Sequence, residues 1–206
     1  MNLTDYIEQH CSKPSEALSQ VERRTYLHNL NPRMVSGPVQ GRLLSMLARM
    51  MKPRRILELG TFTGYSALCL AEAECPVLTI EHNDELEDDI RENLALSPYG
   101  KFVDLLIGDA RQVIPKLEGW FDLIFIDADK RQYNEYLDLC LPKLSADGWI
   151  LADNTLWDGH IIDPAYDKDP QTKALRLFND RVTADSALES MILPIRDGVT
   201  MIRKRG

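Results

Sequence analysis

The stretch 58-ELGTFTGYSAL-68 decides the fold, because it joins a short apolar run to a helix-like run through a glycine-containing loop. Its glycines, Gly60 and Gly64, have the spacing G-x-x-x-G. The fingerprint G-x-G-x-x-G, which brings a backbone against the pyrophosphate of a dinucleotide, is spaced differently. We therefore expect a loop that wraps a small molecule without a pyrophosphate.

Outward from this loop, short apolar runs alternate with amphipathic segments. The runs predict strands at 55–58, 77–81, 103–109, 121–127 and 149–153, separated by helices at 65–73, 84–96, 110–117 and 131–144. Such runs of Ile, Leu, Val and Phe indicate a parallel sheet covered on both faces. The segments 190–195 and 199–204 flank Arg196-Asp197-Gly198, which predicts an antiparallel hairpin at one edge. The expected fold is α/β, a doubly wound, mostly parallel, seven-stranded Rossmann-like sheet.

Two further helices are predicted before the first strand, at 15–30 and 38–51. Ser36 is placed to cap the second, and Pro38 falls in its first turn. No low-complexity linker or repeat interrupts the chain. We therefore predict a single domain over 1–206, in which the helices within 1–51 cover the site.

Composition narrows the function classes. The 206 residues carry a formal net charge of -8, which opposes casual binding to nucleic acid. The start, MNLTDYIEQH, is not a signal peptide, and no apolar run approaches the roughly 18 residues of a membrane span. We expect a soluble cytoplasmic protein. The four cysteines form no C-x-x-C pair and the four histidines are scattered, so buried thiols are expected rather than disulfides or zinc.

Acidic residues close the predicted strands. These residues are Glu58, Glu81, Asp109, Asp127 and Asp153. Any one of them alone could have a purely structural role, as a helix cap or a solvated carboxylate. Ligands of an open parallel sheet bind at the carboxyl ends of its strands, so five such acids in succession predict a site there.

The first candidate ligand is an adenosine-containing cofactor. Glu81 follows Gly60 by 21 residues and ends the second strand, where a carboxylate accepts hydrogen bonds from ribose hydroxyls. This also fits NAD, but the loop favours a cofactor without phosphate that carries an amino acid portion and a positive charge. S-adenosylmethionine is such a molecule, with its carboxylate near backbone N–H groups and Ser66, and its adenine near Asp109 and Ala110. His82 is either a partner for adenine or a surface residue.

The second candidate ligand is a divalent cation. Asp127 and Asp153 end adjacent parallel strands, so their side chains are expected to converge, and Asn154 follows directly. Two carboxylates and an amide carbonyl are hard oxygen ligands that suit magnesium, manganese or calcium and are poor for zinc.

Four motifs carry a family resemblance: ELGTFTGYS, IDADK, ADNTLWDG and the upstream MVSGPVQG. From about Pro32 to the C-terminus the chain resembles the metal-dependent O-methyltransferases typified by the caffeoyl-coenzyme A and catechol enzymes, particularly their short bacterial relatives. The resemblance implies that S-adenosylmethionine contacts Met34, Ser36, the glycine loop with Ser66, Glu81, Ala110 and Asp127, and that Asp127, Asp153 and Asn154 hold the metal. It gives Lys130 the place of the catalytic base, and it implies a homodimer. The full predicted cofactor set is Met34, Ser36, Glu58, Gly60, Thr61, Ser66, Glu81, His82, Asp109, Ala110 and Asp127.

Two differences from the plant and catechol enzymes indicate which branch of that family the chain resembles more. Glu81 stands where the plant enzymes have aspartate, and Ala128-Asp129 stands where the catechol enzymes have His-Trp. The chain is thus nearer the caffeoyl-coenzyme A and bacterial branches, and catechol itself stays open as the substrate.

The chemistry agrees with the resemblance. A phenol with a neighbouring hydroxyl chelates a divalent cation, which favours the phenolate and aims it at the methyl group. Lys130 is either the base, with a pKa lowered by the cation and the sulfonium, or a surface lysine at a helix start. Trp157 either walls an aromatic substrate, which its loop position favours, or packs in the core.

Three functions remain from the sequence. The favoured one is an O-methyltransferase of vicinal dihydroxy aromatic small molecules. The second is a methyltransferase of a hydroxyuridine in transfer RNA, which needs a basic face built from Arg23, Arg24, Arg54, Arg55 and residues 203–205. The third is a Rossmann-type NAD oxidoreductase or a nonenzymatic nucleotide binder, which the glycine spacing and the metal-like pair disfavour.

Overall fold

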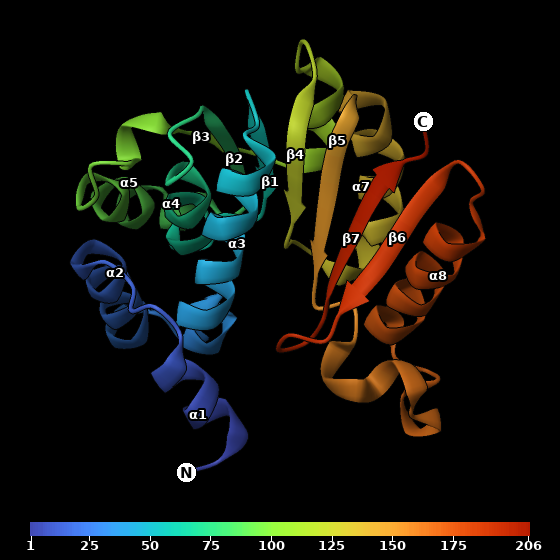
Figure 1. Ribbon diagram of the computed structural model, residues 1–206, viewed down its shortest axis with the longest axis horizontal. Helices are drawn as coiled ribbons and strands as arrows, with labels where there is room; N and C mark the ends of the chain where they lie inside the picture. The colour runs from blue at the N-terminus through green and yellow to red at the C-terminus, as the bar shows by residue number, and fades with distance from the viewer.

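A seven-stranded sheet with the order β3-β2-β1-β4-β5-β7-β6 organises the protein, as the computed structural model in Figure 1 shows. The structure describes residues 1–206 apart from the side chain of Thr4. The strands are β1 (Ile56–Leu59), β2 (Val77–Glu81), β3 (Val103–Ile107), β4 (Phe121–Ile126), β5 (Leu144–Asp153), β6 (Leu188–Leu193) and β7 (Val199–Lys204). The first five run parallel, and β7 pairs antiparallel with both β5 and β6. The predicted fold class is confirmed.

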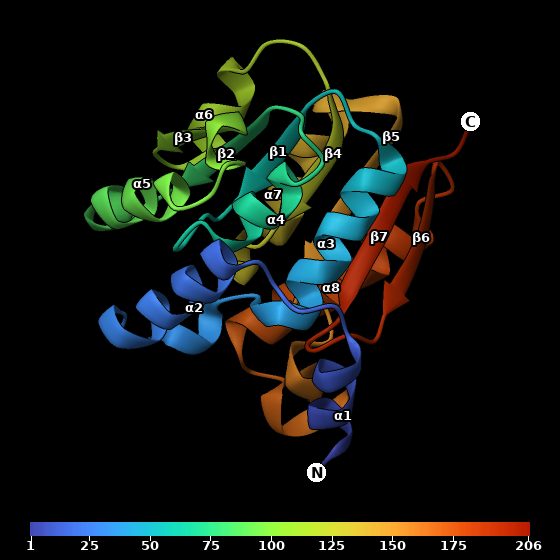
Figure 2. The ribbon, with the colours of Figure 1, turned by 60° about the vertical axis from the view of Figure 1, so that its left-hand side comes forward.

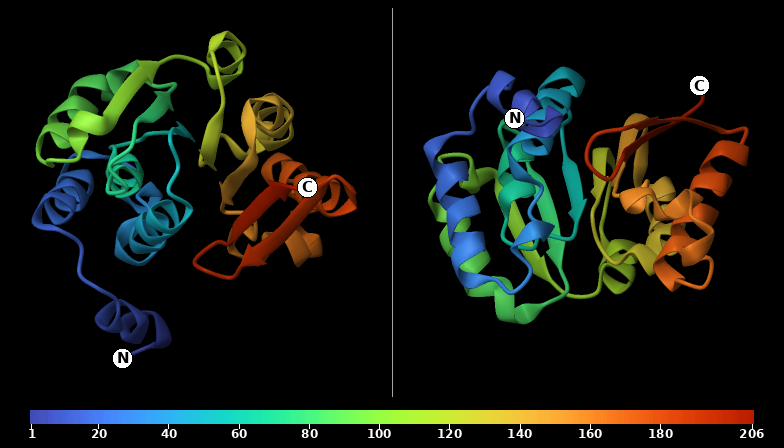
Figure 3. Two further views of the ribbon diagram at one scale, coloured as in Figure 1. Left: turned by 45° about the horizontal axis from the view of Figure 1, so that its top comes forward. Right: turned by 90° about the horizontal axis from the view of Figure 1, so that it is seen from below.

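Helices cover both faces of the sheet, as Figures 1 and 2 show for α3 on one side and α7 on the other. The helices are α1 (Leu3–His10), α2 (Glu16–His28), α3 (Gly37–Met51), α4 (Tyr65–Ala71), α5 (Glu87–Ala95), α6 (Ala110–Val113), α7 (Tyr133–Cys140) and α8 (Pro170–Ala184). One hydrophobic core cluster lies between helices α2, α3, α4 and α5 and one face of the sheet. A second cluster lies between helices α6, α7 and α8 and the other face. Helix α1 lies at the periphery (Figure 3).

Strand order reverses between β1 and β4, and this is where the site is built. Leu59 at the end of β1 is in register with Ile80 of β2 on one side and with Ile126 of β4 on the other. Ile126 is in register with Ala152 of β5. The residues that follow these positions therefore meet at one edge of the sheet, where open α/β sheets bind their ligands.

The sequence misses two helices and part of a strand. Helix α1 was not predicted, and neither was α8, although Asp169 caps α8 and Pro170 opens it. The buried residues of α8 include Leu175, Phe178 and Val182, whose spacing is that of an amphipathic helix. Strand β5 begins at Leu144, ahead of the predicted start, because a register shift against β4 accommodates the polar residues that follow it.

The predicted capping role of Ser36 is wrong. Ser36 precedes α3, but its own backbone is already helical, and its side chain makes no capping hydrogen bond. The chain instead enters α3 through Gly37, whose φ is +72°. The carbonyl oxygen of Ser36 accepts a hydrogen bond from the guanidinium group of Arg196 in the distant β6–β7 turn.

Gly60 should be the least replaceable glycine of the loop. Its φ is +89°, and a Cβ atom there would lie 2.0 Å from the carbonyl oxygen of Asp127, which is main chain and cannot swing aside. We expect Gly60→Ala to lower the free energy of unfolding by about 3 kcal/mol or more in urea titrations, through backbone strain and the displacement of β4. Gly159→Ala is the control, because Gly159 has a φ of +78° and nothing within 4 Å of the added atom. It should cost only about 1–2 kcal/mol, and equal losses for the two variants would contradict the argument.

Candidate active site

A cleft of about 1320 Å³ opens at the carboxyl ends of the parallel strands. It is lined by the loops after β1, β2, β3, β4 and β5, by residues 28–36 ahead of α3, and by the turn between β6 and β7. All but one of the predicted site residues line it: Met34, Ser36, Gly60, Thr61, Ser66, Glu81, His82, Asp109, Ala110, Asp127, Lys130, Asp153 and Asn154. Trp157 lines it as well. Residues that are far apart in the sequence thus share one site.

Glu81 holds the glycine loop in shape. Its Oε2 accepts hydrogen bonds from the backbone N–H groups of Thr61 at 3.1 Å and Phe62 at 2.8 Å, and its Oε1 accepts one from Asn83 at 2.8 Å. A carboxylate offers about four acceptor positions, so one remains for a further donor from the cleft. The predicted contact of Glu81 with a ribose is compatible with this arrangement, in which the same carboxylate also fixes the loop.

Glu58 is the exception among the predicted residues. Leu59 follows it within β1, so the strand-end prediction is wrong for Glu58, and its side chain lies beneath the cleft with 0% exposure. The hydroxyl of Thr79 donates to its Oε2 at 2.6 Å, and its Oε1 has no partner among the described residues. Burial raises the pKa of Glu58 to about 8. Such a carboxyl group is protonated at neutral pH.

The part of the cleft that the sequence predicts to take adenine is polar and partly exposed. Asp109 accepts a hydrogen bond from the backbone N–H of Arg111 at 2.9 Å, which caps α6, and its carboxylate pairs with the guanidinium group of Arg111. That guanidinium group lowers the pKa of Asp109. Ala110 is buried at the start of α6, while His82 is exposed on the rim. Ala110 therefore offers the apolar surface here, and Asp109 stays ionised.

The structure brings Asp127, Lys130 and Asp153 together at the end of the cleft beside Gly60. Lys130 Nζ lies 2.8 Å from Asp127 Oδ1 and donates to the hydroxyl oxygen of Tyr133 at 2.9 Å. The Tyr133 hydroxyl in turn donates to the carbonyl oxygen of Asp153 at 2.8 Å. Both Lys130 and Asp153 are buried. Lys130 is thus part of the site, and its interpretation as a surface lysine is wrong.

The charges of this cluster oppose one another. Burial raises the pKa of Asp153, and the neighbouring charge of Asp127 raises it further. For Lys130, burial lowers the pKa, but the charges of Asp127 and Asp153 raise it, and the net shift is upward. In the protein alone Lys130 is an ammonium group. The downward shift expected from the sequence needs the positive charge of a cation and a sulfonium beside it.

The oxygen atoms of Asp127, Asp153 and Asn154 form the candidate cation site. In the described part of the chain, no group of three or more His, Cys, Asp or Glu side chains is placed to hold a metal ion. The donor set here has a different composition, two carboxylates and one amide carbonyl, and all three residues line the cleft. The carboxylate of the buried Asp153 and that of the partly exposed Asp127 repel each other unless a positive charge offsets them, so this donor set fits a hard divalent cation.

Sequence reasoning missed three side chains that support the cluster. Gln40 of α3 donates through Nε2 to Asp153 Oδ2 at 2.6 Å, and Tyr133 bridges Lys130 to the end of β5. Asp197 of the β6–β7 turn accepts from Asn154 Nδ2 at 3.4 Å. Apart from the contact of Tyr133 with Lys130, which is three residues away, these contacts join segments that are distant in the sequence, and no local pattern indicates them.

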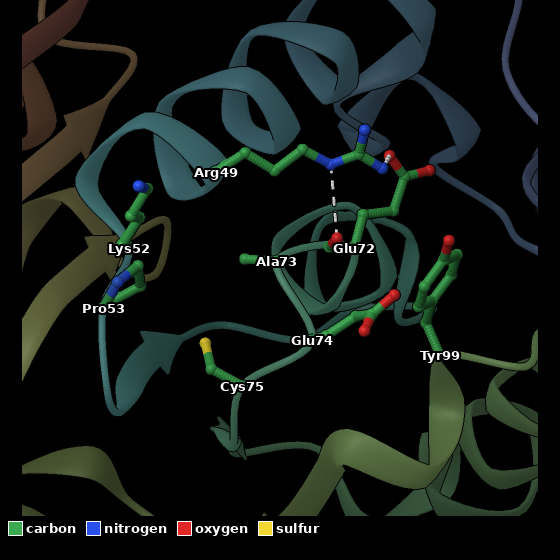
Figure 4. Close-up of a pocket in the computed structure, with 8 residues that line it drawn as sticks. All are labelled: Arg49, Lys52, Pro53, Glu72, Ala73, Glu74, Cys75 and Tyr99. Atoms are coloured by element: carbon green, nitrogen blue, oxygen red, sulfur yellow. Dashed lines mark hydrogen bonds and ion pairs between the residues drawn. The ribbon is translucent and has the colours of Figure 1, made fainter.

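A second cavity, of about 490 Å³, lies at the opposite end of the sheet, before β1 and β2 (Figure 4). It contains no predicted site residue. Its lining residues are Arg49, Lys52, Pro53, Glu72, Ala73, Glu74, Cys75 and Tyr99. Arg49 and Glu72 pair at 3.0 Å, which neutralises the buried carboxylate on its wall.

Comparison with known proteins agrees with this geometry. The profile of a family described as O-methyltransferase matches residues 8–205. A catechol O-methyltransferase of Niastella koreensis is 34% identical over 170 residues, which cover 79% of this chain and 76% of that protein. The caffeoyl-CoA O-methyltransferase of Petroselinum crispum is 31% identical over 205 residues, which cover 92% and 84%. The chain belongs to the O-methyltransferase family.

A solved structure extends the likeness of this O-methyltransferase to three dimensions. The SAH-bound methyltransferase PaMTH1 of Podospora anserina superimposes with a TM-score of 0.91 and 31% identity, covering 99% of this chain and 94% of that chain. The resemblance stated from the motifs is therefore confirmed. Among the described residues of this O-methyltransferase, no helix is long and apolar enough to cross a membrane.

The protonated state of Glu58 predicts a pH dependence of stability. The folded chain releases this proton near pH 8 and the unfolded chain near pH 4.5, so the folded state holds the extra proton in this window. The contribution is full below pH 4.5 and is lost as pH rises towards 8. We expect Glu58→Gln to remove this loss, so that its free energy of unfolding rises relative to the parent by about 1.4 kcal/mol per pH unit between pH 5 and 8.

Urea unfolding at several pH values measures this difference. The control is Glu74→Gln at an exposed position, whose curve should run parallel to that of the parent. A parallel curve for Glu58→Gln as well would contradict the buried, protonated carboxyl group.

Proposed function

We propose that this chain is an S-adenosylmethionine-dependent O-methyltransferase that uses a divalent cation to methylate one hydroxyl of a vicinal dihydroxy aromatic small molecule. The observation that carries the proposal is the placement of Asp127, Asp153 and Asn154 in one cleft with the glycine loop and Glu81. Cofactor residues and hard oxygen donors at adjacent strand ends are what a cation-assisted transfer to a hydroxyl needs.

S-adenosylmethionine is supported by the chemistry of the loop. Gly60 and Gly64 have φ values of +89° and +85°, which let the backbone curve closely round a small molecule. The buried Ser66 lines the same cleft at the first turn of α4, where N–H groups without helical partners favour a carboxylate. The SAH-bound state of the Podospora relative is consistent with this cofactor.

The cation would be held by Asp127, Asp153 and Asn154. When bound, it lowers the pKa of the acceptor hydroxyl and fixes the hydroxyl oxygen in line with the methyl group. Lys130 contributes from the same wall, because it lines the cleft with its Nζ between Asp127 Oδ1 and the Tyr133 hydroxyl. Once cationic neighbours lower its pKa, this amine is placed to take the proton that the acceptor hydroxyl loses.

The aromatic character of the acceptor is supported by Trp157. It lines the cleft just beyond Asn154. Its backbone N–H donates to the carbonyl oxygens of Asn154 at 3.1 Å and Asp197 at 3.3 Å, which fixes the start of this loop. An indole ring at this place presents a flat apolar surface to an aromatic ring. The relatives named for catechol and caffeoyl-CoA agree with an acceptor of this class.

Transfer RNA is the alternative acceptor, and the placement of the arginines disfavours it. Arg24, Arg54 and Arg203 pair with Glu92, Asp122 and Glu189, respectively. The segment 54–55 precedes β1, and residues 203–205 lie at the carboxyl end of the antiparallel β7, so both are at the end of the sheet opposite the cleft. Arg54, Arg55 and residues 203–205 therefore do not extend the cleft with a basic face. A homodimer and a cytoplasmic location remain expectations from the sequence.

The first test compares acceptors and cations. With S-adenosylmethionine and Mg²⁺, the protein should methylate caffeoyl esters or catechols and leave hydroxyuridine-containing transfer RNA unmodified, as followed by mass spectrometry. Chelation with EDTA should abolish transfer, and Mg²⁺, Mn²⁺ or Ca²⁺ should restore it to different degrees. Full activity after chelation would contradict the role of the cation. Methylation of the transfer RNA in place of the catechols would show that the acceptor is a nucleoside and not a small aromatic molecule.

The second test concerns Glu81. Glu81→Ala removes an acceptor for the ribose and three hydrogen bonds that shape the loop, so S-adenosylmethionine affinity should fall by about 1–3 kcal/mol. Calorimetric titration measures the change. The exposed Asp88→Ala on α5 is the matched control and should bind as the parent does. Unchanged affinity in folded Glu81→Ala would remove Glu81 from the cofactor site.

A further inference from the structure

We propose that Gln40 is a positioning residue for the cation site: it fixes the carboxylate of Asp153 from behind the cleft and thereby sets how tightly the site binds a divalent cation. The inference rests on the proposed function, because it assigns a supporting side chain to the Asp127, Asp153 and Asn154 donor set. Gln40 itself does not line the cleft. It acts through Asp153 and not on the substrate.

The contact with Asp153 is short and buried. Gln40 is 0% exposed, and its Nε2 donates to Asp153 Oδ2 at 2.6 Å. The other oxygen, Oδ1, accepts from the backbone N–H of Asn154 at 2.8 Å. One donor on each oxygen fixes the rotation of the carboxylate while each oxygen keeps acceptor capacity for a cation. Asp153 is thus held in one orientation before any ligand arrives.

Packing alone does not account for a glutamine at this position. The amide oxygen Oε1 of Gln40 is buried and has no hydrogen-bond partner among the described residues. A buried polar atom without a partner is unfavourable, and an apolar side chain of the same shape avoids this penalty. The only side-chain hydrogen bond of Gln40 among the described residues is the one to Asp153. The glutamine is therefore explained by its action on that carboxylate.

The backbone on both sides of Gln40 is held in place. A Cβ on the next residue, Gly41, would lie 2.7 Å from the ring of Tyr65 and 2.8 Å from the sulfur of Cys69, so α3 and α4 are in close contact there. On the other side, the Arg196 guanidinium group donates to the carbonyl oxygens of Val35, at 2.9 Å, and Ser36 just before α3. A side chain on so fixed a segment can determine the orientation of a neighbour.

The test replaces the amide and measures cation binding directly. Gln40→Met keeps the length of the side chain and removes both polar atoms, whereas Gln40→Asn keeps the amide but is too short to reach Asp153. We expect each variant to weaken Mn²⁺ binding by about 10- to 100-fold, the usual effect of removing a group that orients a ligand. The electron paramagnetic resonance signal of free Mn²⁺ gives the affinity without any enzyme assay.

Two controls separate a positioning role from a structural one. Ser45→Ala on the same helix removes a buried hydrogen bond to another carboxylate, from Ser45 Oγ to Glu72 at 2.5 Å, and should leave the Mn²⁺ affinity within twofold of the parent. Calorimetry with S-adenosylhomocysteine in the absence of Mn²⁺ should give affinities within twofold of the parent for both Gln40 variants. Circular dichroism identifies the variants that are folded.

The outcomes are distinct. Parent-like Mn²⁺ binding by a folded Gln40 variant overturns the role of Gln40 and leaves the proposed function standing. A Ser45→Ala variant that loses as much affinity as the Gln40 variants also overturns it, because the effect is then general to the helix. A parent protein that binds no Mn²⁺ in the millimolar range overturns the cation site and the role of Gln40 together.

Discussion

The close approach of Gly60 to the main chain of Asp127 is the constraint on which the site depends. The N–H of Asp127 donates to the carbonyl oxygen of Leu59 at 2.8 Å, which extends the pairing of β1 and β4 by one residue. Only a glycine leaves room for this approach, because a Cβ would lie 2.0 Å from the Asp127 oxygen. The glycine loop and the first candidate cation ligand are thus joined directly, and the pairing of β4 with β5 adds Asp153 alongside.

The charges of Asp127, Lys130 and Asp153 explain why so many hydrogen bonds surround these three residues. The negative charge of Asp127 acts on the buried Asp153, and the ammonium group of Lys130 offsets their repulsion in the protein alone. Each oxygen of Asp153 already holds a hydrogen-bond donor, and Tyr133 fixes both Lys130 and the end of β5. The buried Glu58 avoids an uncompensated negative charge in another way, because its raised pKa keeps it protonated at neutral pH.

Much of the fold follows from local sequence patterns. The predicted bounds of β2 and β7 agree with the structure, because apolar runs with polar ends mark strands of a covered sheet. Acids at strand ends predict the cleft correctly, since parallel strands carry their next residues to a common edge. Glu58 departs from this pattern because β1 continues by one residue, which an apolar run bounded on both sides by charge does not indicate. The contacts of Gln40, Arg196 and Asp197 are tertiary, and no local propensity specifies which distant segment they meet.

The proposed function depends on Asp127, Asp153 and Asn154 holding a divalent cation beside the cofactor. The most direct measurement is the anomalous X-ray scattering of Mn²⁺ in crystals grown with S-adenosylhomocysteine and a catechol. We expect one strong anomalous peak within coordination distance, about 2.0–2.3 Å, of oxygen atoms from all three residues. We also expect both catechol oxygens to lie within coordination distance of that peak, with Lys130 next to the oxygen that faces the cofactor sulfur. A clear cofactor and catechol with no peak at these residues, or with Lys130 Nζ still in the place of the cation, would contradict this expectation.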